Sequence, residues 1–256
     1  MKTTVIIPAR MASSRFPGKP LVEIRGLPMI EHVRRRAMLA EGIDRVIVAT
    51  CDQKIFDVVE QAGGKAIMTA DTHERCTTRV DEACRSSDSD IVVVIAGDEP
   101  LTLPETIEQV VKPVQENDEI DCTNILSEIR NNNDFTDMNI VKTATDQKGF
   151  ILYYSRSPIP YYRLQGECPI YRQTGLMAFR TPFLHRYTAL SETPFEKVES
   201  VDMLRLLEHG YRILGVPTSE ETYGVDHPGD IDKVLSVLKT DVRQQKLYKR
   251  SLEVSS

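Results

Sequence analysis

The sequence contains no Cys-x-x-Cys pair, and its five cysteines are odd in number and widely spaced. Zinc ligands at short spacing are therefore missing, which argues against a structural zinc site. No apolar run approaches the length of about eighteen residues that a membrane span needs, and the N-terminus lacks the charged and apolar segments of a secretory signal. These absences predict a reduced, soluble, cytoplasmic protein with no membrane partner.

A basic excess is also missing, because 38 Asp and Glu outweigh 32 Lys and Arg and leave a net charge of -6. Domains that bind nucleic acid normally carry a positive excess, so we expect no nucleic-acid partner, although a local basic pocket stays possible. With 41% apolar and 27% charged residues the composition is that of a globular protein. A chain of 256 residues is long enough for one large domain or for a domain with a subdomain.

A cationic loop follows the first apolar run, residues 4–8. The cations and small residues of this loop are Arg10, Ser13, Ser14, Arg15, Gly18 and Lys19. The loop matches neither the P-loop pattern nor the Gly-x-Gly-x-x-Gly pattern of dinucleotide-binding proteins. Pro17 and Pro20 restrict its path and lower the entropy that a bound ligand would remove. We interpret the loop as a polyphosphate-binding loop, with a solvated connection as the alternative.

The first half of the chain alternates between short apolar runs and amphipathic segments. Strands are predicted at residues 4–8, 46–50, 66–68 and 91–95, and helices at residues 28–42, 55–62, 77–85 and 104–116. This alternation predicts an α/β fold of Rossmann-like type, a mainly parallel sheet flanked by helices. Ligands of such sheets bind at the carboxyl ends of the strands.

After about residue 120 the alternation is lost. Residues 140–144 and 150–154 are spaced like a hairpin, residues 130–134 are expected to form a loop, and residues 171–179 a strand. A helix is predicted from Thr193 through Leu207, a last strand at residues 211–216 and a helix at residues 230–239, followed by a polar tail that frays. We expect a single domain, residues 1–256, whose β-rich insertion at about 120–195 covers the site or makes a dimer contact.

Two aspartates follow predicted strands at the edge where ligands bind. Asp98 lies between Gly97 and Pro100 after the strand 91–95, and Asp226 lies in a glycine-bounded turn after the last strand. Carboxylates there suit Mg²⁺, which usually takes one or two of them together with substrate phosphates. The alternatives are a turn residue for Asp98 and a turn or cap residue for Asp226.

Four stretches form a more specific pattern. They are residues 7–21 (Ile-Pro-Ala-Arg-Met-Ala-Ser-Ser-Arg-Phe-Pro-Gly-Lys-Pro-Leu), 97–100 (Gly-Asp-Glu-Pro), 154–156 with 159–160 (Tyr-Ser-Arg and Ile-Pro) and 224–226 (Gly-Val-Asp). Together they resemble the 3-deoxy-manno-octulosonate (Kdo) cytidylyltransferase family, the CMP-Kdo synthetases, in register from about residue 3 to residue 238. The resemblance implies a nucleotidyltransferase of Rossmann-like fold.

This resemblance also implies an activity: transfer of CMP from CTP to the anomeric hydroxyl of an acidic sugar of a surface polysaccharide such as lipopolysaccharide. The reaction releases pyrophosphate, requires Mg²⁺ and is carried out by a dimer. By motif, the phosphates of CTP would be held by Arg10, Ser14, Arg15 and Lys19, and its base and ribose would contact Met68, Thr69, Thr77 and Arg79. Asp98 and Asp226 would hold Mg²⁺, acting with Arg15 and Lys19 as the catalytic residues, and Arg156 would face the acidic sugar.

The sequence departs from the family pattern mainly on the sugar side. Ala96 stands where the family usually has Gln, Gln173 where it has His, and 201–205, which includes Asp202, replaces Leu-Glu-Gln-Leu-Arg. Residues 75–79 replace Ser-Gly-Thr-Glu-Arg in the nucleotide segment. The acceptor could therefore be Kdo, amino-Kdo or a related ulosonic acid. The alternatives are a different acid, such as a phosphonate or a nonulosonic acid, and a noncatalytic nucleotide-binding homologue.

Overall fold

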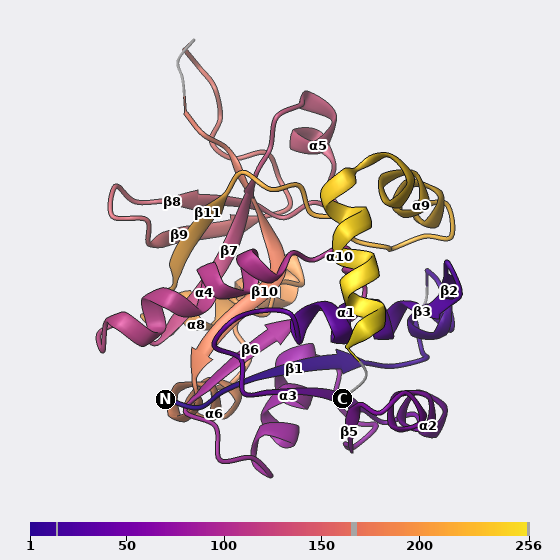
Figure 1. Ribbon diagram of the computed structural model, residues 1–256. Coiled ribbons are helices and arrows are strands. Elements are labelled where there is room, and N and C mark those ends of the chain that lie inside the picture. Colours follow the sequence, from indigo (N-terminus) through magenta and orange to yellow (C-terminus); the bar gives the residue numbers. More distant parts are fainter. Residues whose placement is uncertain (14, 165–167, 255–256) are drawn as a thin grey trace. The chain divides into compact units, whose positions relative to one another are not determined.

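The computed structural model describes residues 1–13, 15–164 and 168–254 (Figure 1). The chain divides into two compact units, one formed by residues 1–108 and 222–256 and the other by residues 109–221. No helix in the described residues is both long enough and apolar enough to cross a membrane.

The first unit is built on four parallel strands. They are β1 (Thr3–Ala9), β4 (Arg45–Thr50), β5 (Lys65–Met68) and β6 (Ile91–Ile95), in the order β6-β1-β4-β5. Every residue of β1 and β6 is buried. Apolar runs without alternation are typical of strands covered on both faces, and they predicted this parallel arrangement.

The helices of this unit connect or cover the strands. They are α1 (Met29–Ala37), α2 (Gln53–Gln61), α3 (Cys76–Cys84), α9 (Asp230–Thr240) and α10 (Val242–Glu253), together with the 3-10 helix η1 (Lys19–Leu21) and the small hairpin β2 (Glu23–Ile24) and β3 (Leu27–Pro28). Helices α1 and α3 pack against β1 and β4, and α10 packs against α1 and α9 (Figure 1).

The polar C-terminal tail does not fray, so that expectation was wrong. Residues Val242–Glu253 form α10, whose N-cap Asp241 accepts a hydrogen bond from the Gln244 backbone N–H. One face of this helix is buried through Gln244, Leu247 and Ser251. The Gln244 side chain donates to the Leu101 carbonyl at 3.1 Å, which ties the helix to the loop after β6. Tertiary contacts therefore order a segment whose composition is polar.

The second unit contains the remaining strands. They are β7 (Cys122–Glu128), β8 (Lys142–Thr145), β9 (Ile151–Ser155), β10 (Tyr171–Arg180) and β11 (Leu214–Thr218). Strand β7 pairs antiparallel with β10 and parallel with β11, and β8 pairs antiparallel with both β9 and β10. The predicted hairpin of β8 and β9 is confirmed. Strand β7 was not predicted.

The helices of the second unit are α5 (Asn132–Thr136), α6 (Thr181–Thr188), α7 (Pro194–Glu199) and α8 (Leu204–Glu208), with the last eight residues of α4 (Pro104–Glu116), which was predicted with the same bounds. Two helical segments and one strand of this unit correct our expectations. Residues 130–134 are partly helical, because Asn131 caps α5. The single helix predicted from Thr193 is broken at Ser200, whose φ is 52°. The last strand begins at Leu214 rather than at residue 211.

Candidate nucleotide site

The strand order of the first unit reverses at β1, which pairs with β4 on one side and with β6 on the other. Loops that leave such neighbouring strands in opposite directions open a crevice at the carboxyl ends, where α/β sheets bind ligands. Glycine at position 97 lets these loops approach, because a Cβ there would lie 3.0 Å from the Pro8 carbonyl oxygen. The loop after β1 and the loop after β6 therefore meet at the expected place.

The loop after β1 is closed by its own backbone. The Gly18 N–H donates to the Met11 carbonyl at 3.0 Å, and Gly18 has a φ of 75°, which favours glycine. The Met11 N–H donates to the Asp52 carboxylate at 2.7 Å, which fixes the loop to the end of β4. Residue Ser14, expected to contact phosphate, lies outside the described residues. The chain then enters η1, which begins with Lys19.

Lys19 is the centre of a charged cluster. Its Nζ lies 2.5 Å from Asp98 Oδ2 and 3.8 Å from Asp226 Oδ1, and it donates to the Val225 carbonyl at 2.7 Å. The Lys19 side chain is 12% exposed, whereas the two carboxylates are one third to one half exposed. Arg15 adds a second cation, because its Nη2 lies 3.0 Å from Asp226 Oδ1. The structure thus brings all four of these predicted site residues together.

Hydrogen bonds from the backbone around Asp226 hold this residue at the cluster. The Val225 N–H donates to the Asp98 carbonyl at 2.9 Å, which joins the returning chain to the loop after β6. The N–H groups of Asp226 and His227 both donate to Asp230 Oδ2 at 2.8 Å. Asp230 begins α9 and so holds the turn that presents the Asp226 carboxylate.

These carboxylates fit a magnesium ion that is completed by substrate phosphates. The described residues contain no group of three or more His, Cys, Asp or Glu side chains placed to hold a metal. Mg²⁺ commonly takes only one or two protein carboxylates and completes its shell with phosphate and water. The Lys19 ammonium shows that a cation fits between Asp98 and Asp226. The donor set therefore suits a hard cation carried by a nucleotide.

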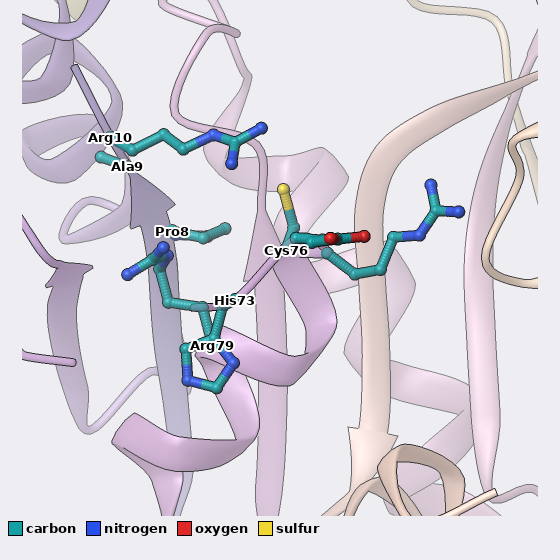
Figure 2. Close-up of a pocket in the computed structure, with 8 residues that line it drawn as sticks. Pro8, Ala9, Arg10, His73, Cys76 and Arg79 are labelled. Carbon is teal, nitrogen blue, oxygen red and sulfur yellow. The ribbon is translucent and has the colours of Figure 1, made fainter. Parts of the chain in front are cut away.

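A small pocket of about 50 Å³ lies beside the end of β1 (Figure 2). It is lined by Pro8, Ala9, Arg10, His73, Glu74, Arg75, Cys76 and Arg79. Three of these residues carry guanidinium groups and one carries a carboxylate. Arg10 from the loop after β1 and Arg79 from α3 were both predicted to contact the nucleotide, and they line the same pocket.

The hydrogen-bond donors of the buried Arg79 side chain are only partly used within the described part of the chain. This residue is 3% exposed, and its Nη1 donates to Thr69 Oγ1 at 2.6 Å and to the Ala70 carbonyl at 3.1 Å. Within the described part of the chain its buried Nη2 has no hydrogen-bond partner. A buried donor without a partner is costly, so this atom points to a ligand acceptor in the pocket. Among the other residues predicted here, Thr77 is buried in α3, and Met68 is 43% exposed at the end of β5.

A histidine and a glutamate fix the segment between β5 and α3. His73 Nε2 hydrogen-bonds to Glu82 Oε2, and the same carboxylate accepts from the Ala70 N–H. The hydrogen bond with His73 holds the pKa of Glu82 below its ordinary value. Glu82 was not among the predicted site residues, although its spacing of three residues from Arg79 on α3 places both on one helix face.

Among the predicted sugar-side residues of the second unit, Arg156 is hydrogen-bonded to backbone carbonyls. Arg156 donates through Nε to the Glu199 carbonyl at 2.6 Å and through Nη1 to the Met138 carbonyl at 3.0 Å. Gln173 lies in β10, where the pairing with β7 shifts register, and Asp202 lies in the turn before α8, where its carbonyl accepts from the Arg205 N–H. In the first unit, Ala96 directly follows β6, and its carbonyl accepts a hydrogen bond from the Glu99 N–H. The roles of these four residues remain predictions.

Comparison with known proteins identifies related sequences. Residues 4–213 match the sequence model of the cytidylyltransferase family. A 3-deoxy-manno-octulosonate cytidylyltransferase of Geotalea uraniireducens is 43% identical and aligns over 93% of this chain and 100% of its own length. The protein of that name from Acaryochloris marina is 41% identical over 91% of this chain and 96% of its own.

Solved structures give the same picture of the fold. A CMP:2-keto-3-deoxy-manno-octonic acid synthetase in complex with CTP has a TM-score of 0.90 and 34% identity, and covers 94% of this chain and 100% of that one. A cytidylyltransferase from Leptospira borgpetersenii, at 17% identity, has a TM-score of 0.65 over 99% of this chain and 93% of its own, which supports the fold alone. The Rossmann-like nucleotidyltransferase fold is thereby confirmed.

Proposed function

Because this chain belongs to the 3-deoxy-manno-octulosonate cytidylyltransferase family, we propose that it transfers CMP from CTP to 3-deoxy-manno-octulosonate and releases pyrophosphate. The observation that carries the proposal is the match to relatives of this activity over nearly the whole chain. The chain is thus a nucleotidyltransferase, and CTP is its nucleotide substrate.

The residues of the first unit supply the binding of CTP in this proposal. Arg10, Arg15 and Lys19 neutralise the phosphates, since guanidinium and ammonium groups both pair with phosphate oxygens. Arg79 offers its buried Nη2 to an acceptor of the base or ribose. Glu82 and Thr69 hold the segment and the Arg79 side chain in place. Positioning and charge neutralisation supply most of the catalysis in chemistry of this kind.

Asp98 and Asp226 are proposed to hold Mg²⁺. When bound there, Mg²⁺ neutralises charge on the phosphate oxygens of CTP. The two aspartates also orient the anomeric hydroxyl, whose oxygen forms a bond to the α-phosphorus and gives up its proton to solvent while the bond to pyrophosphate breaks. Lys19 and Arg15 already contact these carboxylates, so the phosphates enter a site whose cations and anions are in place.

Two further assignments follow from the family resemblance. Arg156, Gln173 and Asp202, together with Ala96, are proposed to bind the acidic sugar, with the planar fork of Arg156 facing the carboxylate. The chain is proposed to act as a homodimer.

The test is a pyrophosphate-release assay with CTP, Mg²⁺ and a panel that contains 3-deoxy-manno-octulosonate, its amino analogue, a nonulosonic acid and a phosphonate. We expect release with 3-deoxy-manno-octulosonate. A faster reaction with the amino analogue would indicate that Ala96 and Gln173, which differ from the family pattern, determine which acceptor is preferred. No release with any acceptor would contradict the proposal and favour the noncatalytic alternative.

Aspartate variants test the metal assignment in the same assay. Asp98→Ala and Asp226→Ala are expected to abolish pyrophosphate release, because each removes a proposed metal ligand. Asp232→Ala, in the first turn of α9, is the matched control and should retain the rate. Full activity in either site variant, with CTP binding unchanged, would overturn the metal assignment.

A further inference from the structure

Cys76 is the cysteine of the nucleotide pocket. It is the first residue of α3, it is exposed, and it lines the pocket with Arg10, Arg75 and Arg79. In Figure 2 the Cys76 thiol points toward the side of the pocket where the Arg10 guanidinium lies. A helix N-terminus and neighbouring guanidinium groups are surroundings in which a cysteine reacts as its thiolate.

The pocket itself carries independent evidence of a ligand. Arg79 is 3% exposed, and in the described part of the chain its Nη2 lacks a hydrogen-bond partner. Around this donor the lining holds three guanidinium groups against the single carboxylate of Glu74. A small concave site with this excess of one sign concentrates anions. The pocket therefore favours negatively charged molecules over cationic ones as reagents for the Cys76 thiol.

We propose that Cys76 is a thiolation site: it forms a mixed disulfide with a small anionic thiol of the glutathione class, and this adduct closes the pocket to the nucleotide. The Cys76 thiolate attacks one sulfur of the oxidised thiol dimer, a new sulfur–sulfur bond forms, and the old one breaks. The departing thiolate takes a proton from water. Cysteine is oxidised and one thiol equivalent is reduced, so an excess of reduced thiol reverses the reaction.

The other cysteines differ from Cys76 in ways that predict selectivity. Cys84 and Cys122 are buried, and burial raises the pKa of the Cys122 thiol well above its ordinary value. The Cys51 thiol lies 3.6 Å from the Asp52 carboxylate, an acidic neighbour that repels a thiolate. Cys168 is exposed but does not line the pocket, so it serves as the matched control.

Intact-mass analysis of the reduced protein after exposure to oxidised glutathione tests the site. We compare the native chain, Cys76→Ser and Cys168→Ser, and repeat each with cystamine, a cationic disulfide. At Cys76 the anionic disulfide is expected to react about tenfold faster than the cationic one, a preference that falls with added salt and is absent at Cys168. Modification of Cys168 alone, or equal rates for the two reagents at Cys76, would overturn the proposal.

The effect on the nucleotide rests on the proposed function and has its own measurement. CTP is expected to slow adduct formation at Cys76, and the glutathionylated protein is expected to lose CTP binding until dithiothreitol restores it. In Cys76→Ser, whatever its initial affinity, oxidised glutathione should leave CTP binding unchanged. An adduct that forms at the same rate with and without CTP and leaves binding intact would overturn the closure. The mass shift requires no catalytic turnover. It therefore tests thiolation of Cys76 even if the chain releases no pyrophosphate.

Discussion

At the scale of single residues, His32 shows how burial fixes a charge state. The ring is fully buried in α1, Nε2 donates to the Ile24 carbonyl at 2.7 Å, and the Tyr248 ring stacks on it. Burial, as the main cause, lowers the pKa of His32 from 6.5 to about 4. The folded protein therefore contains a neutral histidine over a pH range in which the unfolded chain takes up a proton.

This difference predicts a pH dependence of stability. The contribution of a neutral His32 is complete above pH 6.5 and is lost as the pH falls toward 4, because between these values the unfolded state binds the additional proton. The expected loss in free energy of unfolding is roughly 3 kcal/mol. Urea titrations at several pH values measure it. His32→Gln should flatten the curve between pH 6.5 and 4, whereas the same change at exposed His209 should not; an unchanged slope in His32→Gln would refute this account.

The proximity of site residues was predictable where a sequence motif contains them and not where the fold alone creates the contact. Arg15, Lys19, Asp98 and Asp226 belong to sequence motifs, and the structure brings them together. The bond from His73 to Glu82 has no such signal, because it depends on the path of the chain between β5 and α3. The carbonyl partners of Arg156 are likewise set by tertiary contacts.

At the scale of elements, apolar runs predicted the parallel strands well, and three features escaped. Strand β7 contains Thr123, Asn124 and Ser127, which are buried although polar. The Asn124 side chain donates to the carbonyls of Thr174 and Leu176, contacts that no local pattern reveals. The break at Ser200 interrupts a hydrophobic spacing that continues across it, since periodicity does not report backbone conformation. Helix α10 was missed because few of its residues are apolar.

A core substitution in α10 tests whether this helix stabilises the first unit. Leu247 is 4% exposed, and Leu247→Ala should lower the free energy of unfolding by about 2–4 kcal/mol through lost burial and a cavity. Leu252 lies on the same helix and is 47% exposed, so Leu252→Ala should cost no more than about 0.5 kcal/mol. Urea denaturation measures both. Equal, small effects would mean that α10 packs only loosely.

At the scale of the whole molecule, the residues proposed to bind CTP and Mg²⁺ all belong to the first unit. A ligand that binds only the folded protein stabilises it by mass action, by about 2.7 kcal/mol at one hundred times its Kd. The sequence contains no tryptophan, so calorimetry is the direct measurement. Mg-CTP should raise the Tm of the transition in which the first unit unfolds by about 5–10 °C. Mg-GTP at the same concentration is the control, and an equal shift would contradict selection of cytosine.

The position of Lys19 between Asp98 and Asp226 has a thermodynamic consequence. Since Lys19 and Arg15 together already neutralise these two carboxylates, binding of the proposed metal would be a cation exchange and not an addition to bare charge. A phosphate chain that arrives with the metal gives the displaced ammonium a new counter-ion. Mg²⁺ alone should therefore bind weakly, and nucleotide and metal should bind with strong positive synergy. These internal cations keep the net charge of the ligand-free site near zero until the metal and the nucleotide are both present.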